Sequence, residues 1–576
     1  MPGVTVSEDP PAPPAPSADE LVEELKDFVA GLDPMGFGPA LVSAASSLAG
    51  RPFPLARATV SYWGGAGQAV FASAMRAVGV EVDGPAEAPG SDRRYSDRAY
   101  RDNAWFYLSR QQHALFADYL RQLAAEADLD PTSQRKLEFA VDQVVEALAP
   151  TNFPLTNPAV LKRAFDTGGH SLLRGAQNLL RDVLTNNGEP RQVTPGRFQV
   201  GRDLAVTPGK VVYRNRLIEL IQYAPATETV HRVPMLFSPP WINKYYILDL
   251  APGKSLVEWA VRHGHTCFAI SYRNPDGGLR DVGMSDYLRE GPLAALEVIR
   301  DITGAPEANI VALCLGGTLA TATAAWLSAR GEPGVSTLTL MNTLLDFTEP
   351  GALGVFTDAD TVRNLERMMR RPGYLPASRM KATFDALRPA DLVWNYVVNN
   401  WLMGDEPAAF DLLAWNGDST RMPAAMQLEY LRTCYVDNQL ATGKMVLGGE
   451  RLDLGAVHRD AYVITAEADH IAPWRTVYGG ARLLGGEVRF VLSNSGHIAG
   501  VVNPPSARSR HWYADVDRLP ERPEEWHGRA ERRAGSWWED WTPWIAGRAG
   551  EMVAPPPMGS PTHPPLLDAP GSYVHN

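Results

Sequence analysis

Residues 308–327 read ANIVALCLGGTLATATAAWL, and the fold class can be inferred from this stretch. Its first part is apolar and β-rich, and a long Ala-rich helical pattern follows Gly316 and Gly317. The pattern therefore predicts a buried strand, a sharp turn and a buried helix. The run from Asn309 to Ala329 is uncharged and long enough to raise a membrane-spanning alternative. Its glycines, its threonines and its change of composition favour a strand followed by a helix.

Cys314 stands at the turn between the predicted strand and the predicted helix. A strand, a sharp turn with small neighbours and a helix form the nucleophile elbow of α/β-hydrolases. Here the nucleophile would be a thiol, and the helix N-terminus favours its thiolate form. The elbow pattern has Gly two residues before the nucleophile, whereas this chain has Ala312, which is small enough to fit. The motif alone does not decide, because a Cys beside a buried strand is commonly a small packing residue.

Two further side chains complete a candidate triad in the chain order nucleophile, acid, histidine. Asp469 follows the predicted strand AYVITAE, and His497 follows the predicted strand VRFVLS. Sites of open α/β sheets gather at such strand ends. His470 is a rival base, but we prefer His497 because adjacent side chains on an extended loop point apart. Asp469 also has an alternative interpretation as the N-cap of a helix beginning near Pro473.

The chain divides into three parts that differ in composition and in the spacing of their apolar residues. Residues 1–17 are Pro-rich and are expected to be disordered. Residues 18–190 have apolar residues at helical spacing, as in SQRKLEFAVDQVVEAL, which predicts a helical N-terminal domain. Residues 191–576 alternate Val- and Ile-rich strands with helices, which predicts a catalytic domain with a mostly parallel, helix-flanked sheet. We interpret the helical stretch at about 347–455, rich in Trp, Met and Asn, as a cap inserted into this domain.

Composition argues against several functional classes. The net charge of −12 at pH 7 disfavours nucleic acid as a partner, because phosphate binding requires a basic surface. An anionic substrate would need a local basic patch, which the sequence does not locate. The 3 cysteines are too few for a disulfide framework or a zinc site. Since the N-terminus also lacks a secretory pattern, we expect a cytoplasmic protein without a transmembrane segment.

Other residues that could carry chemistry are interpreted as structural. His263 and His265 are spaced like a metal-binding pair, yet no further ligand lies near them in the sequence, so no metal or cofactor site is predicted. Cys267 and Cys434 are expected to be buried packing residues. The tryptophans of WWEDWTPW, residues 537–544, should pack over the catalytic domain in an irregular segment.

Several stretches together resemble polyhydroxyalkanoate synthases, over most of the chain from about Asp92 onward. They are NFPLTNPAVLKRA, SPPWINKYYILDLAPGKSLVEWAVRHGHTCFAISYRNPD, ALCLGGTLA, LLDFTEPGALGVF, TAEADHIAPW, SGHIAGVVNPP and GSWWEDW. The single-chain layout is similar to the class I or class II enzymes. The resemblance implies that Cys314, Asp469 and His497 polymerise (R)-3-hydroxyacyl-CoA thioesters into polyester. It also implies a homodimer, a mobile cap and a location on cytoplasmic polyester granules, with granule-associated proteins as candidate partners.

The three side chains predict a covalent mechanism. His497 takes the proton of Cys314, and the thiolate attacks the CoA thioester and releases CoA. Because one thioester replaces another, the acyl group stays activated for transfer to the 3-hydroxyl of a second acyl unit. His497 is the expected base for that hydroxyl, and Asp469 either orients His497 or polarises the hydroxyl.

The surroundings of the reaction are predicted from the same motifs. The backbone N–H of Leu315 and a second one from the loop around Trp241 and Ile242 should hold the oxyanion. The apolar cap should keep water out, so that transfer outcompetes hydrolysis. The cap segment from Phe347 to about Asp391 is expected to be its most mobile part, because its turns have few apolar anchors.

Two other functions remain open on the sequence alone. A cysteine-type thioesterase or esterase would use the same fold, and a product assay separates polymer from free acid. A catalytically inert, granule-binding structural protein is a rival from another class, against which the intact set of three side chains argues. The sequence does not reveal the preferred acyl length or the CoA-binding residues.

Overall fold

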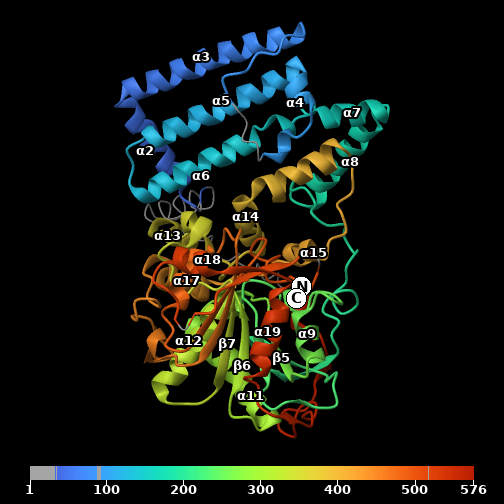
Figure 1. The fold of residues 1–576 in the computed structure, drawn as a ribbon, viewed down its shortest axis with the longest axis vertical. Coiled ribbons are helices and arrows are strands. Elements are labelled where there is room, and N and C mark those ends of the chain that lie inside the picture. Colours follow the sequence, from blue (N-terminus) through green and yellow to red (C-terminus); the bar gives the residue numbers. More distant parts are fainter. Residues whose placement is uncertain (1–32, 34, 87–91, 507, 517) are drawn as a thin grey trace, which may run out of the picture.

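The computed structural model describes residues 33, 35–86, 92–506, 508–516 and 518–576. The Pro-rich stretch 1–17, for which we expect disorder, lies outside the described residues, as does the helical pattern of 18–32. The N-terminal helices form one end of the long axis of the molecule, and the sheet forms the other (Figure 1). The helices inserted into the sheet domain lie between these two ends.

Helices make up the N-terminal region, as the apolar periodicity predicts. Asp130 caps one of them by accepting hydrogen bonds from the backbone N–H groups of Thr132 and Ser133. Asn157 caps the next helix in the same way, directly before Pro158. The helices are α2 (Phe37–Ala49), α3 (Pro52–Ala77), α4 (Ala99–Asp102), α5 (Ala104–Glu126), α6 (Pro131–Ala147), α7 (Pro158–Asp166) and α8 (His170–Thr185).

Within the described residues, an 11-stranded sheet has the order β15-β14-β13-β12-β7-β6-β4-β5-β2-β1-β17. The central strands from β13 to β5 are parallel, whereas both edges pair antiparallel. The expectation of a mostly parallel sheet is therefore right for the centre and wrong for the edges. At one edge, β1 and β2 are joined by a connection too short for a parallel crossover. The strands are β1 (Gly209–Arg214), β2 (Ile218–Tyr223), β4 (Met235–Ser238), β5 (Cys267–Tyr272), β6 (Ala308–Leu313), β7 (Val335–Met341), β12 (Asp460–Ala466), β13 (Val488–Ser493), β14 (Arg510–Tyr513), β15 (Glu531–Ala534) and β17 (Leu567–Asp568).

The strand β6 and the helix that follows it explain the long uncharged run at 309–329. Every residue of β6 is buried, and α12 (Leu315–Arg330) is buried along most of its length. Both elements are thus covered by protein on all sides, so neither needs a polar face. In the described part of the chain, no helix combines the length and apolarity needed to cross a bilayer. The other helices of the sheet domain are α9 (Leu256–Arg262), α10 (Met284–Leu288), α11 (Ala294–Thr303), α17 (Trp474–Ala481), α18 (Pro523–Arg529) and α19 (Trp537–Ala546).

Between β7 and β12 the chain leaves the sheet and forms the segment that we call the cap, residues 347–455. It is mainly helical, with α13 (Ala359–Met369), α14 (Ala377–Leu387), α15 (Asp411–Gly417) and α16 (Ala424–Tyr430). Wider helical turns cover Ala390–Trp394, Val397–Leu402 and Leu431–Val436. Short strand pairs join β8 (Tyr374–Leu375) to β9 (Met422–Pro423), β10 (Val446–Leu447) to β11 (Glu450–Arg451) and, outside the cap, β3 (Val230–His231) to β16 (Met552–Val553).

The N-terminal helices dock on the cap. The Asn178 amide on α8 donates to the backbone carbonyl of Asn400, 3.0 Å away. The Gln143 amide on α6 donates to the carbonyl of Ala386, also at 3.0 Å. Gly175 on α8 touches the cap so closely that a Cβ there would lie 2.0 Å from the carbonyl oxygen of Trp401. The helical region is therefore joined to the segment that covers the sheet.

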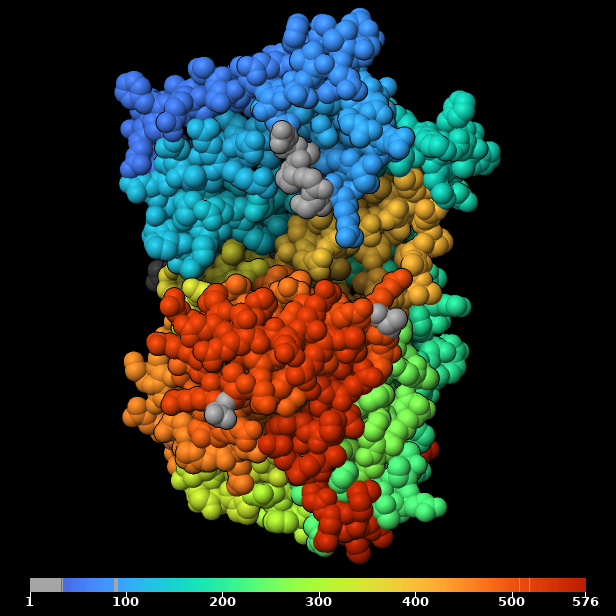
Figure 2. Space-filling model, viewed as in Figure 1, coloured from blue at the N-terminus to red at the C-terminus, as the bar shows by residue number. Residues whose placement is uncertain are grey.

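The C-terminal tryptophans lie on a helix, which corrects the expectation of an irregular segment. The Ser536 hydroxyl accepts a backbone N–H bond at the start of α19, and the Glu539 carboxylate accepts from the Ser536 N–H at 2.8 Å. This capping box starts the helix, which continues through Pro543. Trp541 donates to the Thr339 hydroxyl on β7 at 3.0 Å, so the tryptophans pack against the sheet. The C-terminal part, coloured orange to red, covers much of the sheet domain in Figure 2.

Candidate active site

Cys314 lies at a strained turn between β6 and α12. Its φ is 51° and its ψ is −121°, a backbone conformation that residues other than glycine rarely adopt. The Cys314 N–H donates to the carbonyl of Met341 on the neighbouring strand β7, 2.8 Å away. The turn holds the thiol at the first position before the helix, where backbone N–H groups point outward. This is the geometry of a nucleophile elbow.

The small residues around Cys314 are required by close contacts. A Cβ on Gly316 would lie 2.2 Å from the carbonyl oxygen of Ser238, and one on Gly317 would lie 2.0 Å from the hydroxyl of Thr343. Both positions therefore exclude any side chain. Ala312, where the elbow pattern has Gly, is completely buried between β4 and β7, and its methyl group fits there. The departure from the pattern leaves the turn intact.

Asp469 and His497 come together from loops that follow neighbouring parallel strands. Asp469 follows β12 and His497 follows β13, and the carboxylate Oδ2 accepts from the imidazole Nδ1 at 2.7 Å. The side chain of Asp469 is fully buried and that of His497 is 9% exposed. The other nitrogen of the ring is thus left for a reacting group. The structure brings together the acid and the histidine that the chain order predicts.

The structure also separates the alternatives for this pair. The second oxygen of Asp469 accepts from the backbone N–H groups of Ile471 and Ala472, each at 2.9 Å. Asp469 therefore shapes its own loop and orients His497 at the same time, and His470 is not its partner. The following helix α17 begins at Trp474 with Pro473 as its N-cap residue, so the interpretation of Asp469 as that N-cap is wrong.

The electrostatics of the pair favour a charged imidazole. Burial opposes the imidazolium, but the Asp469 carboxylate and the nearby Cys314 sulfur outweigh it and raise the pKa of His497 to about 10. A proton on His497 is thereby stabilised beside the sulfur of Cys314. Such a pairing is the basis of Cys–His nucleophiles, in which the histidine activates the thiol.

Asn342 is a supporting residue that the sequence analysis missed. It follows β7 with a φ of 47°, and its buried side-chain amide donates to the backbone carbonyl of His497. Its own N–H donates to the carbonyl of Ile464 on β12 at 2.8 Å. Asn342 thus ties the His497 loop to the sheet. The sequence signal for this residue is an Asn directly after a strand, because Asn adopts the left-handed backbone region more readily than most residues.

The loop expected to complete the oxyanion hole lies against the elbow. Gly316 contacts the carbonyls that end β4, so the loop after this strand runs beside the start of α12. Trp241 in this loop is buried, and its ring lies 5.7 Å from that of Tyr430. Ile242 lines the cavity that holds Cys314, as does Leu315. The roles of Leu315, Trp241 and Ile242 as N–H donors stay predictions.

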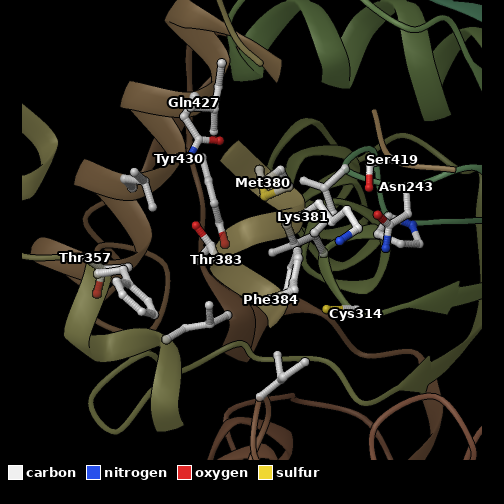
Figure 3. A pocket seen from close by; sticks show the side chains of 18 of the residues that line it. Asn243, Cys314, Thr357, Met380, Lys381, Thr383, Phe384, Ser419, Gln427 and Tyr430 are labelled. Atoms are coloured by element: carbon white, nitrogen blue, oxygen red, sulfur yellow. The ribbon is translucent and has the colours of Figure 1, made fainter. Parts of the chain in front are cut away.

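A largely apolar cavity contains Cys314 and His497 and is roofed by the cap. Helix α14 passes over the site, with Met380, Lys381, Thr383 and Phe384 facing the cavity above Cys314 (Figure 3). Met35, from the N-terminal region, also lines this space. The walls are thus built from three parts of the chain. The sequence analysis did not single out the individual cap residues that line these walls.

The residues that we interpret as structural lie away from this cavity. His265 is buried and stacks on His231 with ring centres 4.5 Å apart, and burial lowers the pKa of His265 to about 3. Groups of three or more candidate metal ligands are absent from the described residues. Cys267 and Cys434 are completely buried, and burial raises the pKa of both thiols. None of these side chains lines the cavity that contains Cys314.

Known proteins are similar in sequence to this chain over most of its length. Residues 91–260 match the family model described as "Poly-beta-hydroxybutyrate polymerase (PhaC) N-terminus", and residues 252–504 match the model of the alpha/beta hydrolase fold. "Poly(3-hydroxyalkanoate) polymerase subunit PhaC" of Rhizobium meliloti is 43% identical, over 87% of this chain and 82% of that protein. "Poly(3-hydroxyalkanoate) polymerase" of Methylorubrum extorquens is 42% identical, over 88% and 84%. "Poly(3-hydroxyalkanoate) polymerase 1" of Ectopseudomonas oleovorans is 40% identical, over 85% and 87%.

These matches extend through both the helical region and the sheet domain, and they agree with the resemblance that the sequence motifs indicate. They cover most of the length of the relatives as well as most of this chain. The PhaC N-terminus model covers part of the helical region and the first strands of the sheet, and the alpha/beta hydrolase model covers the cap and much of the sheet domain. On this identity and coverage, the chain belongs to the family of poly(3-hydroxyalkanoate) polymerases.

Proposed function

We propose that this chain polymerises (R)-3-hydroxyacyl-CoA thioesters into polyhydroxyalkanoate, with release of CoA, through an acyl-enzyme on Cys314. The observation that carries the proposal is the geometry around this thiol. A cysteine at a strained elbow shares an apolar cavity with a histidine that is held at 2.7 Å by a buried carboxylate. Membership of the polymerase family supports the same activity.

In the first half-reaction His497 accepts the proton of Cys314, and the thiolate attacks the carbonyl carbon of the thioester. A tetrahedral oxyanion forms, which the N–H of Leu315 and one N–H of the 241–242 loop stabilise. The carbon–sulfur bond to CoA then breaks, and the imidazolium of His497 returns its proton to the leaving thiolate. The raised pKa of His497 suits this step, because it favours the imidazolium while the sulfur is charged.

In the second half-reaction the 3-hydroxyl of another acyl unit attacks the acyl-enzyme. His497 removes the hydroxyl proton and then passes it to the thiolate of Cys314 as the new ester forms. Asp469 holds His497 in the required orientation through Nδ1, which leaves Nε2 as the atom that carries the proton. The contact favours the orienting role of Asp469 over direct polarisation of the hydroxyl.

The cap makes transfer to an alcohol competitive with hydrolysis. Apolar residues of the cap, among them Met380 and Phe384, cover the thiol and limit the access of water. A CoA thioester must nevertheless enter and a growing chain must leave, so the cap has to move during turnover. We propose that its segment from Phe347 to Asp391 moves most.

The direct test is incubation of the purified protein with 3-hydroxybutyryl-CoA while CoA release and polymer formation are followed together. Polymer in proportion to released CoA supports the proposal. Release of CoA with only free 3-hydroxybutyrate as product would instead show a thioesterase. The same assay without any CoA release would support the inert, structural alternative.

We further propose a homodimer on cytoplasmic polyester granules. The N-terminal helices expose large apolar side chains, such as Phe53 (86% exposed), Trp63 (68%) and Phe165 (87%). A surface of this kind suits an apolar polymer better than water. Sedimentation of the purified protein with isolated polymer particles measures this binding, and light scattering measures the oligomeric state. Recovery of the protein in the supernatant, or a monomer at working concentration, would contradict these proposals.

A further inference from the structure

Gln427 on α16 is a buried polar side chain with an unpaired hydrogen-bonding atom. The residue is 5% exposed and lines the same cavity as Cys314. Its Oε1 atom is buried and has no hydrogen-bond partner among the described residues. Buried side-chain amides are usually paired, since an unpaired one loses its hydrogen bonds to water. The unpaired oxygen therefore indicates a donor that arrives with a ligand.

The position of Gln427 excludes a direct part in the bond-making steps. Tyr430, one helical turn later on α16, lines the same cavity as Cys314. In Figure 3, Gln427 lies next to Tyr430 in the upper part of the view, and Cys314 lies lower, beside Phe384. The 3-hydroxyl that attacks the acyl-enzyme must lie next to His497. Gln427 thus faces a part of the substrate that is distant from the reacting carbonyl.

The chemistry of the substrate identifies that part. A saturated acyl tail has no polar group, and the ester oxygens of a growing polyester accept hydrogen bonds but cannot donate them. The pantetheine arm of CoA contains amide N–H groups, which are donors. We infer that Gln427 binds an amide N–H of this arm, so that the end of the cavity beyond Tyr430 receives CoA. The inference rests on the proposed function and names the CoA subsite of the same cavity.

A cation lines the same cavity as Gln427. The strands β8 and β9 pair through Tyr374 with Pro423 and through Leu375 with Met422. Because this pair is antiparallel, α14 with Arg379 and α16 with Gln427 leave it at opposite ends, and both side chains line the cavity. Arg379 is exposed and also lines the cavity. A guanidinium at the edge of the cavity suits the phosphates of CoA, which lie beyond the pantetheine arm.

The helices α13 and α14 add to this charge. In a chain of net charge −12, the stretch 359–387 contains more basic than acidic residues. The acidic ones are Asp360, Glu366 and Asp385, and the basic ones are Arg363, Arg367, Arg370, Arg371, Arg379 and Lys381. The two helices therefore have a local basic excess of the kind that an anionic substrate requires, although Arg363 and Lys381 are paired with Asp360 and Asp385.

Gln427→Leu tests the inference because it removes the amide and keeps the volume. The rate of thiol release is measured with the 3-hydroxybutyryl thioesters of CoA, of pantetheine and of ethanethiol. Loss of one hydrogen bond to a buried amide should lower kcat/KM about tenfold with CoA and pantetheine, mainly through KM. The ethanethiol ester has no amide and should react with Gln427→Leu as fast as with the unchanged protein. Gln439→Leu, which changes a glutamine bonded to Asp437, is the matched control and should leave all three rates unchanged.

The outcomes are distinct. An equal loss with all three thioesters would assign Gln427 to the acyl or polymer part and overturn the inference, as would no loss with any of them. Thermal unfolding of Gln427→Leu gives a second readout, because removal of an unpaired buried amide should keep or raise Tm. A clearly lower Tm would show a structural role instead. Failure of the unchanged protein to release CoA would refute the proposed function, whereas a normal rate in both proteins would refute only the subsite.

Discussion

The ion pair between Lys136 and Asp358 joins the N-terminal region to the cap, and its removal gives a measurable prediction. Lys136 lies on α6, and its Nζ atom is 2.7 Å from Oδ2 of Asp358, the N-cap residue of α13. The two side chains are only 5% and 15% exposed. Next to them, the ring of Phe139 lies 5.1 Å from that of Phe356, which lines the active-site cavity. We therefore expect this contact to hold the cap over Cys314.

The change Lys136→Met keeps the apolar stem and removes the ammonium group. Removing one partner of a buried ion pair costs about 3–5 kcal/mol, because the other charge stays buried. Asp358 keeps hydrogen bonds from the hydroxyl and the N–H of Thr361, so we expect a cost of about 2–3 kcal/mol. Burial raises the pKa of Asp358, but Lys136 and Thr361 outweigh it and hold this pKa below its ordinary value. In the variant the carboxyl should therefore become easier to protonate.

Hydrogen exchange of the α13 amides, residues 359–369, measures the effect where it occurs. A cost of about 2–3 kcal/mol corresponds to exchange that is roughly 30- to 150-fold faster. Lys162→Met is the matched control, because the pair of Lys162 with Asp166 has the same distance of 2.7 Å but is exposed, with side chains 76% and 52% accessible. That change should leave the exchange of α13 unaltered.

A second substitution tests the explanation. Adding Asp358→Asn to Lys136→Met removes the unpaired charge and should slow the exchange of α13 again. Exchange in Lys136→Met that matches the control would refute the idea that this ion pair anchors the cap. Faster exchange that Asp358→Asn does not reduce would show that the buried charge is not the cause.

The remaining predictions concern the candidate triad. Cys314→Ala should lower CoA release about 10³-fold or more in a folded protein, and Cys314→Ser should keep only a small residual activity, as measured by thiol titration. His497→Ala should abolish polymer formation while His470→Ala retains most of it, and the reverse order would contradict the choice of base. Asp469→Asn should impair elongation more than acylation, so that mass spectrometry detects a trapped acyl-enzyme. Because the pKa of His497 is raised from 6.5 to about 10, the protonated ring stabilises the fold below about pH 6.5. This stabilisation is lost as the pH rises toward 10, and His497→Gln should flatten that part of the curve of unfolding free energy against pH.

The positions of the candidate triad residues could be predicted from the sequence because they depend on local patterns. Cys314 follows a buried strand and precedes a helix, and Asp469 and His497 follow β12 and β13, two later strands of the parallel centre of the sheet. The carboxyl ends of parallel strands meet at one edge of a sheet, so side chains placed just after them converge without further information. Ala312 stands where the elbow pattern has Gly, and its small size, which is visible in the sequence, is what lets it fit this buried position.

The contacts that complete the site were decided only by the tertiary structure. The pairing of Lys136 with Asp358, the Asn342 amide on the His497 carbonyl and the unpaired oxygen of Gln427 involve segments that are distant in the chain. Near the start of the cap, the ring of Phe356 packs against Phe139 of the N-terminal region, although the two residues are distant in the chain. Hydrophobic periodicity reports which face of an element is buried, but it does not report which other element covers that face. That choice is made when the helices pack, and it therefore appears only in the folded chain.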